Sequence, residues 1–280
     1  MHNLEIDSGL PVLVEGAVSF ETGATRAQVA DFSLWVYEHH GEGFGWADPG
    51  ALTCFFDDLA HGRPMPPKFA SRAIRDIDVL VALALHRNPD LVFLPNAFRL
   101  VNATDFVHRR GAVGMAHVDQ DLIQFFRFLR GLFPKTLTKK DFESHIEQSV
   151  EFIQDYIGND RLPQLGREPE PPTILDTGTR RFVVAETGGS LGEAWVHLFR
   201  NGFARGVVFG KDHKGRRDIL GARRGPYVGF NLEMATRLLN DIERAMGEPP
   251  EWKNDALWLY GPPEGSLLLV TYVLEVLVRV

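Results

Sequence analysis

The sequence predicts an α/β protein in which a larger N-terminal domain is linked to a smaller C-terminal domain of the same class. Short apolar runs typical of buried strands alternate with stretches of helical period. A polar, proline-rich segment interrupts the chain at residues 159–173, and the order strand, helix, strand follows it. We therefore expect one domain at residues 1–158, a linker at 159–173 and a second domain at 174–280.

The N-terminal part begins with two predicted strands and a helix. Residues 10–18, LPVLVEGAV, form a short apolar run, and residues 32–37, FSLWVY, are rich in β-branched and aromatic side chains. The segment 48–62, DPGALTCFFDDLAHG, is predicted as a helix because an Asp-Pro pair suits its start and a glycine its end. The one cysteine, Cys54, lies in this apolar stretch and is interpreted as a small buried hydrophobe.

The rest of the first domain is predicted to be mainly helical. Residues 69–89, FASRAIRDIDVLVALALHRNP, are expected to form a helix that ends at the Asn-Pro pair. Residues 98–111, FRLVNATDFVHRRG, are ambiguous between a strand and a short helix. Residues 119–134 and 138–158 show the apolar period of amphipathic helices.

The second domain has its own pattern. RRFVVAET (180–187) and FARGVVFGK (203–211) are predicted strands, with a helix at 188–202 between them and another at 231–247. The glycine-rich start of residues 188–202 lacks the lysine and the spacing of a nucleotide-binding loop, so we do not interpret it as one.

Composition excludes some classes of partner. The net charge is −7 and the isoelectric point is near 5.8, which argues against an extended grip on long duplex nucleic acid. No uncharged apolar run reaches the ~20 residues that a membrane helix needs, and the N-terminus does not resemble a signal peptide. We therefore expect a cytoplasmic protein without a membrane partner, and a homo-oligomer stays open.

An acid and two histidines follow the second predicted strand. Glu38, His39 and His40 stand in VYEHHGEGFG, directly before three glycines in five residues. Neutral imidazoles and carboxylates ligate divalent metals, histidine also serves in acid–base catalysis, and glycines permit close approach of a ligand. The alternative is an exposed, solvated histidine pair on a turn.

Further acids could complete such a site. Asp76 and Asp78 are two residues apart in RDID, so their carboxylates would face one side of a strand but diverge on a helix. Asp105 stands in NATDF, and Asp119 could either ligate a metal beside His117 or cap the following helix.

The second domain carries a basic cluster that suits an anionic group. Arginine offers a planar fork that matches phosphate, although a solvated basic hairpin is the alternative. The turn GPPEGS could present backbone amides to a ligand. The predicted substrate-binding residues are Lys211, His213, Arg223, Arg224, Gly265 and Ser266.

Together these segments resemble the DHH phosphoesterase superfamily. YEHHG is similar to its Asp-His-His motif with Glu38 in place of the aspartate, RDIDVLVALAL to its Asp-x-Asp motif, and NATDF to its late aspartate motif. ILGARRGPYVGFNLEMATRLLN resembles part of the family's smaller domain, and GPPEGS stands where the family has Gly-Gly-His. The chain departs from the family in motif order, because RDID follows EHH, and in the missing histidine of GPPEGS.

The resemblance implies a metal-dependent phosphoester hydrolase acting on a nucleotide, a short oligonucleotide or a phosphorylated metabolite. It implies manganese as the cofactor, with zinc or magnesium as alternatives, and catalytic roles for His39 and His40. A catalytically inactive ligand-binding or assembly protein on a related scaffold is the alternative function, and a metal hydrolase of another fold is a third. The metal ligands expected from the resemblance are Glu38, His39, His40, Asp76, Asp78 and Asp105.

Overall fold

The structure is a computed structural model of the whole chain. Its contacts divide the chain into two compact units, residues 1–110 with 118–167 and residues 111–117 with 168–280. The division at 167/168 falls inside the segment predicted as a linker. The structure describes residues 13–31, 35–39, 43, 50–71, 76–133, 139–163, 170–177, 182–211, 217–224, 231–262, 265–266, 268 and 270–279.

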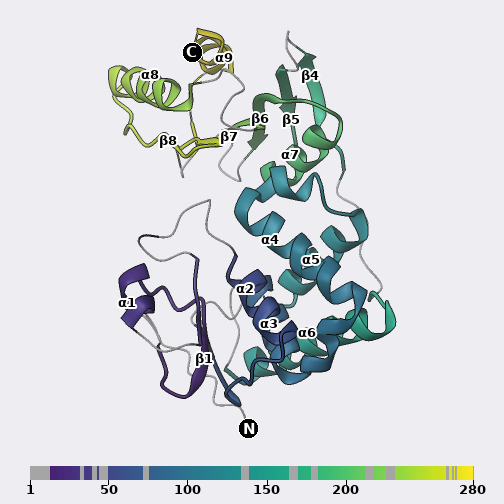
Figure 1. The fold of residues 1–280 in the computed structure, drawn as a ribbon. Helices are drawn as coiled ribbons and strands as arrows, with labels where there is room; N and C mark the ends of the chain where they lie inside the picture. Colours follow the sequence, from purple (N-terminus) through teal and green to yellow (C-terminus); the bar gives the residue numbers. More distant parts are fainter. Residues whose placement is uncertain are drawn as a thin grey trace. The chain divides into compact units, whose positions relative to one another are not determined.

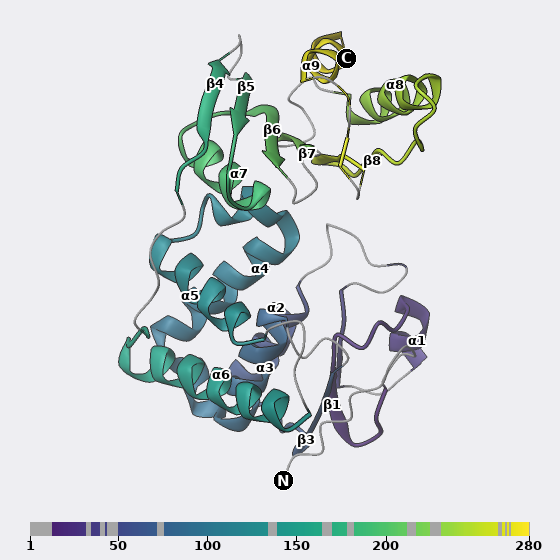
Figure 2. The ribbon, with the colours of Figure 1, turned by 180° about the vertical axis from the view of Figure 1, so that it is seen from behind.

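A small parallel sheet forms one part of the first unit. Strand β1 (Ala17–Phe20) lies between β2 (Val36–Tyr37) and β3 (Lys68–Ser71), and both neighbours run parallel to it. Helix α1 (Arg26–Asp31) connects β1 to β2, and α2 (Ala51–Ala60) connects β2 to β3. Figures 1 and 2 show α1 on one side of β1, with α2 and the following helix on the other.

Two predictions about these strands were wrong in detail. The first strand was expected at 10–18, but β1 begins at Ala17 after a turn. Residues 69–89 were expected to be one helix, but β3 occupies Lys68–Ser71 and helix α3 only Ile77–Arg87. Pairing with β1 supplies β3 with backbone hydrogen bonds that the local sequence does not reveal.

Helix α3 is the buried centre of the first unit. Every residue from Ile77 to Leu85 is buried, because α2, α5 (Gln120–Gly131) and α6 (Lys139–Asn159) all contact it. Among these residues, Asp78 is the one carboxylate. An ionisable side chain in so apolar a helix is costly without compensating partners.

The remaining helices of the first unit largely follow the sequence. The segments predicted as helices at 119–134 and 138–158 correspond to α5 and α6. The ambiguous segment at 98–111 lies within the long helix α4 (Pro95–Met115), which follows the short helix η1 (Pro89–Phe93). No helix among the described residues combines the length and apolar character needed to cross a bilayer.

The second unit is built on a six-stranded mixed sheet. Its strand order is β4-β5-β6-β7-β9-β8, with β5 parallel to β6 and the other neighbours antiparallel. The predicted strand–helix–strand unit is therefore present as β5, α7 and β6. The elements are β4 (Thr173–Thr177), β5 (Phe182–Glu186), α7 (Leu191–Arg200), β6 (Arg205–Lys211), β7 (Arg217–Arg223), α8 (Leu232–Ala245), β8 (Lys253–Asn254), β9 (Trp258–Tyr260) and α9 (Val270–Arg279).

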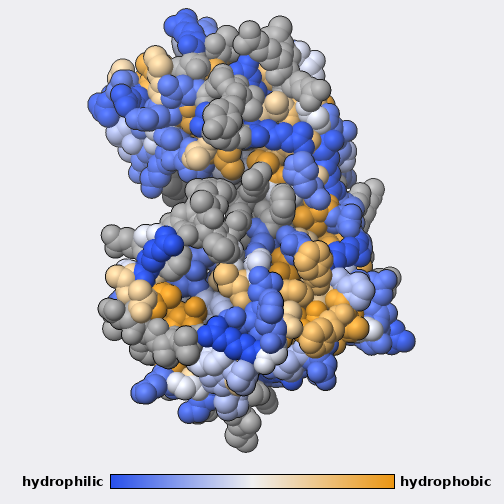
Figure 3. Space-filling view, in the orientation of Figure 1, coloured by the Kyte–Doolittle hydropathy of each residue, from blue (hydrophilic) through white to orange (hydrophobic). Residues whose placement is uncertain are grey.

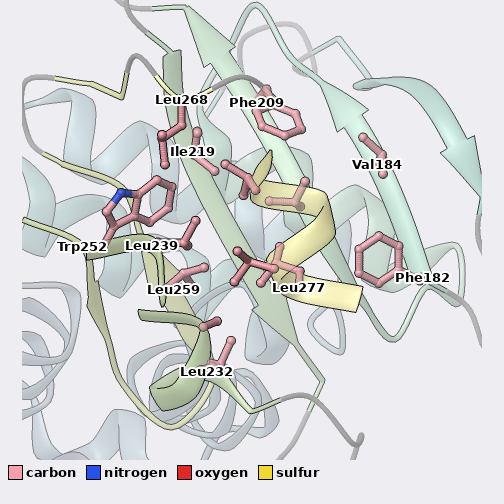
Figure 4. Close-up of a cluster of buried hydrophobic side chains, with 14 residues drawn as sticks. Phe182, Val184, Phe209, Ile219, Leu232, Leu239, Trp252, Leu259, Leu268 and Leu277 are labelled. Carbon is pink, nitrogen blue, oxygen red and sulfur yellow. The ribbon is translucent and has the colours of Figure 1, made fainter. Parts of the chain in front are cut away.

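The core of this unit lies between the sheet and two helices. Figure 4 shows Phe182 and Phe209 on strands facing Leu239 of α8 and Leu277 of α9, and all four are buried. The parallel pair β5–β6 also requires a glycine at 206, because a Cβ there would lie 2.0 Å from the carbonyl oxygen of Val183. The described surface seen in Figure 3 is largely hydrophilic, with apolar residues over the helices of the first unit.

Candidate metal centre

Parallel strands bring the polar residues that follow them to one edge of a sheet. Glu21 comes directly after β1, Glu38 and His39 come directly after β2, and Asp78 lies in the first turn of α3, which follows β3. Ligands of open α/β sheets bind at the carboxyl ends of the strands. These side chains therefore lie where this class of fold places its sites.

Three of them form a compact group with ligand character. One side-chain atom each of Glu21, His39 and Asp78 lies within 4.8 Å of the other two. Glu21 and Asp78 are buried, with exposed fractions of 3% and 1%. Around one ion with bonds of about 2.1 Å, ligand atoms lie about 3–4 Å apart, so a small contraction would bring all three onto a shared cation.

The electrostatics of the group favour a cation. Burial raises the pKa of Glu21 far above its ordinary value of 4.5, and the charge of Asp78, hydrogen-bonded to Glu21, raises it further. Asp76 and Glu38 act on the pKa in the same direction. A carboxyl group surrounded by other carboxylates in a buried site must hold either a proton or a cation.

His39 lies beside Glu21 in the group. Its Nδ1 accepts a hydrogen bond from the backbone N–H of Ala51, at 3.1 Å, and lies 3.3 Å from Oε1 of Glu21. An imidazole nitrogen has a single lone pair, so Nδ1 could bind a cation shared with Glu21 only in place of the Ala51 hydrogen bond. Carboxylate and imidazole ligands together suit a divalent ion.

Glu21 adopts a strained backbone. Its φ is +46°, in the left-handed region that a residue other than glycine seldom adopts. The N–H of Glu21 nevertheless donates to the carbonyl oxygen of Tyr37, at 2.9 Å. Strain of this kind persists where the surroundings impose it and gathers at functional sites.

Asp105, on α4, lies outside this group of three. Its buried carboxylate accepts a hydrogen bond from the hydroxyl of Thr53, and a Cβ on Gly50 would lie 2.3 Å from Oδ2. Because Gly50 and Ala51 are adjacent, Oδ2 of Asp105 and Nδ1 of His39 lie within about 9 Å of each other. Asp105 therefore stands at the amino end of α2, where a negative charge is stabilised.

The other predicted ligands have different positions. Asp76 is exposed and has an extended backbone immediately before α3, whereas Asp78 is buried in the first turn of that helix. Glu38 is buried but binds backbone N–H groups of Gly23 and His39. His40 lies outside the described residues.

Glu21 is the member of the group that the sequence reasoning missed. With the first strand placed at 10–18, residue 21 fell in a connection of no assigned role. The available signal was an acid directly after the apolar run AVSF and before Thr-Gly.

In the second unit the predicted substrate-binding residues make internal contacts. Nε of Arg223 donates to the carbonyl oxygen of Ala256, at 2.9 Å, and the guanidinium carbon of Arg224 lies 6.0 Å from the ring centre of Phe199. The hydroxyl of buried Ser266 donates to Oε1 of Glu243, at 2.7 Å. These contacts are structural, and the substrate-binding role of both arginines and Ser266 stays a prediction.

The other three predicted substrate-binding residues are Gly265, Lys211 and His213. Gly265 has a φ of +77°, which favours glycine, and its N–H donates to the carbonyl oxygen of Pro262. Lys211 ends β6, and His213 lies outside the described residues.

Asp119 also has a clear position. It precedes α5, and its carboxylate accepts hydrogen bonds from Arg99 at 2.6 and 3.1 Å. This ion pair accounts for Asp119 without a metal.

The chain was compared with protein families, curated proteins and solved structures. No family model, no curated protein and no solved structure matches the chain.

Proposed function

We propose that the protein is a metal-dependent phosphoester hydrolase whose cation is held by Glu21, His39 and Asp78. The observation that carries the proposal is the buried group of two carboxylates and one imidazole at the carboxyl edge of a parallel sheet. The proposed substrate is a nucleotide, a short oligonucleotide or a phosphorylated metabolite. Manganese, zinc and magnesium are the candidate ions.

Each residue has a defined task in this proposal. Glu21 and Asp78 supply negative charge in a site from which water is largely excluded, so their attraction for a cation is little screened. His39 would supply a ring nitrogen; ligation through Nδ1 would replace the hydrogen bond that this nitrogen accepts from the Ala51 N–H. A bound divalent ion would polarise a phosphoryl oxygen and supply hydroxide at neutral pH.

The test is metal binding by matched variants. We expect the wild-type protein to take up Mn²⁺ or Zn²⁺, measured by titration calorimetry and elemental analysis. Asp78→Asn should weaken binding at least tenfold, because it removes a buried charged ligand. Asp76→Asn is the control for the electrostatic part of this loss, since it removes an exposed charge immediately before α3 that acts on Glu21 without belonging to the group.

Two results would contradict the proposal at different points. A wild-type protein that takes up neither ion would remove the metal site. A protein that binds metal in the expected way but hydrolyses none of a panel of nucleotides, dinucleotides and p-nitrophenyl phosphate esters would favour the alternative function, a ligand-binding protein without catalysis.

A further inference from the structure

The carboxylate of Glu38 connects the ends of two neighbouring strands. Its exposed fraction is 6%. Oε2 accepts hydrogen bonds from the backbone N–H of Gly23, at 2.7 Å, and from the hydroxyl of Thr22, at 3.4 Å. Oε1 accepts from the N–H of His39, at 2.9 Å. Both carboxylate oxygens of Glu38 therefore accept hydrogen bonds, one from residues that follow Glu21 and the other from His39.

The loop after β1 needs such an anchor because of its backbone. Glu21 and Gly23 both have positive φ, +46° and +76°, and the chain bends at Glu21. Before the bend, the N–H of Glu21 donates to the carbonyl oxygen of Tyr37. After it, the N–H of Gly23 donates to Glu38. The strained residue is held from both sides by the end of β2.

We propose that Glu38 is a positioning residue that acts through Glu21: it holds the loop that aims the Glu21 carboxylate at Asp78 and His39. This inference rests on the proposed metal site and changes the role of Glu38 from ligand to support. Groups that orient ligands typically alter metal affinity ten- to a hundredfold when they are replaced.

The experiment is a double-mutant cycle read by Mn²⁺ affinity. The N–H groups of Gly23 and His39 bond to different oxygens of Glu38, so in Glu38→Gln one of them faces the amide NH₂, which is a donor. We expect Mn²⁺ to bind ten- to a hundredfold more weakly to this variant. Glu15→Gln is the control, because it removes the same charge from an exposed position just before β1.

The double-mutant cycle distinguishes an effect of Glu38 on Mn²⁺ affinity that acts through Glu21 from an effect that is independent of Glu21. If Glu38 acts through Glu21, then Glu38→Gln should weaken binding less than threefold further in a Glu21→Gln background. An equal loss in both backgrounds would overturn the inference, and so would wild-type affinity in Glu38→Gln alone. In either case Mn²⁺ binding by the wild type would still support the metal site.

A spectroscopic measurement distinguishes support from ligation. Co²⁺ in the site should give the same visible absorption bands in wild type and Glu38→Gln, because no ligand is lost. Altered band positions and intensity would make Glu38 a ligand and contradict the proposal. If thermal unfolding shows that Glu38→Gln does not fold, Thr22→Val replaces it, with a two- to tenfold loss of affinity expected and unchanged affinity as the contrary result.

Discussion

Replacing Glu21 by glutamine should stabilise the metal-free protein at neutral pH. In the unfolded chain this carboxyl group ionises with a pKa near 4.5, whereas burial and the neighbouring carboxylates raise its pKa far above that value in the folded protein. At pH 7 the folded state therefore retains a proton that the unfolded chain has released. Each pH unit between 4.5 and 7 costs about 1.4 kcal/mol, so the wild-type protein loses at most about 3 kcal/mol.

The sign of the pH dependence follows from the raised pKa. Below pH 4.5 both states hold the proton and Glu21 causes no loss, and the loss grows as pH rises towards the folded-state pKa. Glu21→Gln cannot ionise, so its advantage over the wild type should be small at pH 5 and reach up to about 3 kcal/mol at pH 7.

Urea unfolding with a chelator present, at several pH values between 5 and 8, measures this difference. Glu15→Gln serves as the control for charge loss at an exposed position. A Glu21→Gln protein that is less stable than wild type at pH 7, or whose stability difference is the same at every pH, would refute the reasoning. Added Mn²⁺ should raise the stability of the wild type and leave the variant nearly unchanged.

Two further substitutions test the surroundings of the site and the core of the second unit. Gly50→Ala should destabilise the protein by about 1–3 kcal/mol, because its Cβ would collide with the Asp105 carboxylate; chemical denaturation measures this, and the loss should shrink in an Asp105→Ala background. Glu243→Leu should cost about 1–3 kcal/mol or more per donor, because it leaves the buried Trp252 Nε1–H and Ser266 hydroxyl without their acceptor. Glu243→Gln should be milder in thermal unfolding, since one oxygen accepts both bonds, and equal losses for Leu and Gln would contradict this account.

Local pattern predicted most of the helices. The apolar period of residues 119–134 and 138–158 corresponds to α5 and α6 within a few residues at each end. The strand–helix–strand order after residue 180 likewise reappears as β5, α7 and β6. Helical period and β-branched content are properties of adjacent residues, so they can be read without knowledge of the fold.

Strand β3 shows where local pattern is insufficient. The segment Lys68–Ser71 is short and continues towards a strongly apolar helix, so sequence alone extended that helix backwards. Its strand conformation depends on hydrogen bonds to β1, about fifty residues earlier in the chain. The same non-local pairing determines where β1 begins and ends, and with it the position of Glu21.

By itself, the sequence determined the chemistry available at the site and part of its location: an acid and histidines after one strand, and two acids ahead of an apolar helix. Only the tertiary structure decided which of them meet. The start of α3 buries Asp78 in its first turn and leaves Asp76 exposed just before the helix. The carboxylate of Glu38 accepts hydrogen bonds from backbone N–H groups. Parallel pairing of β1 with β2 and β3 brings Glu21 to the same edge, because contacts between distant segments depend on the packing of the whole unit.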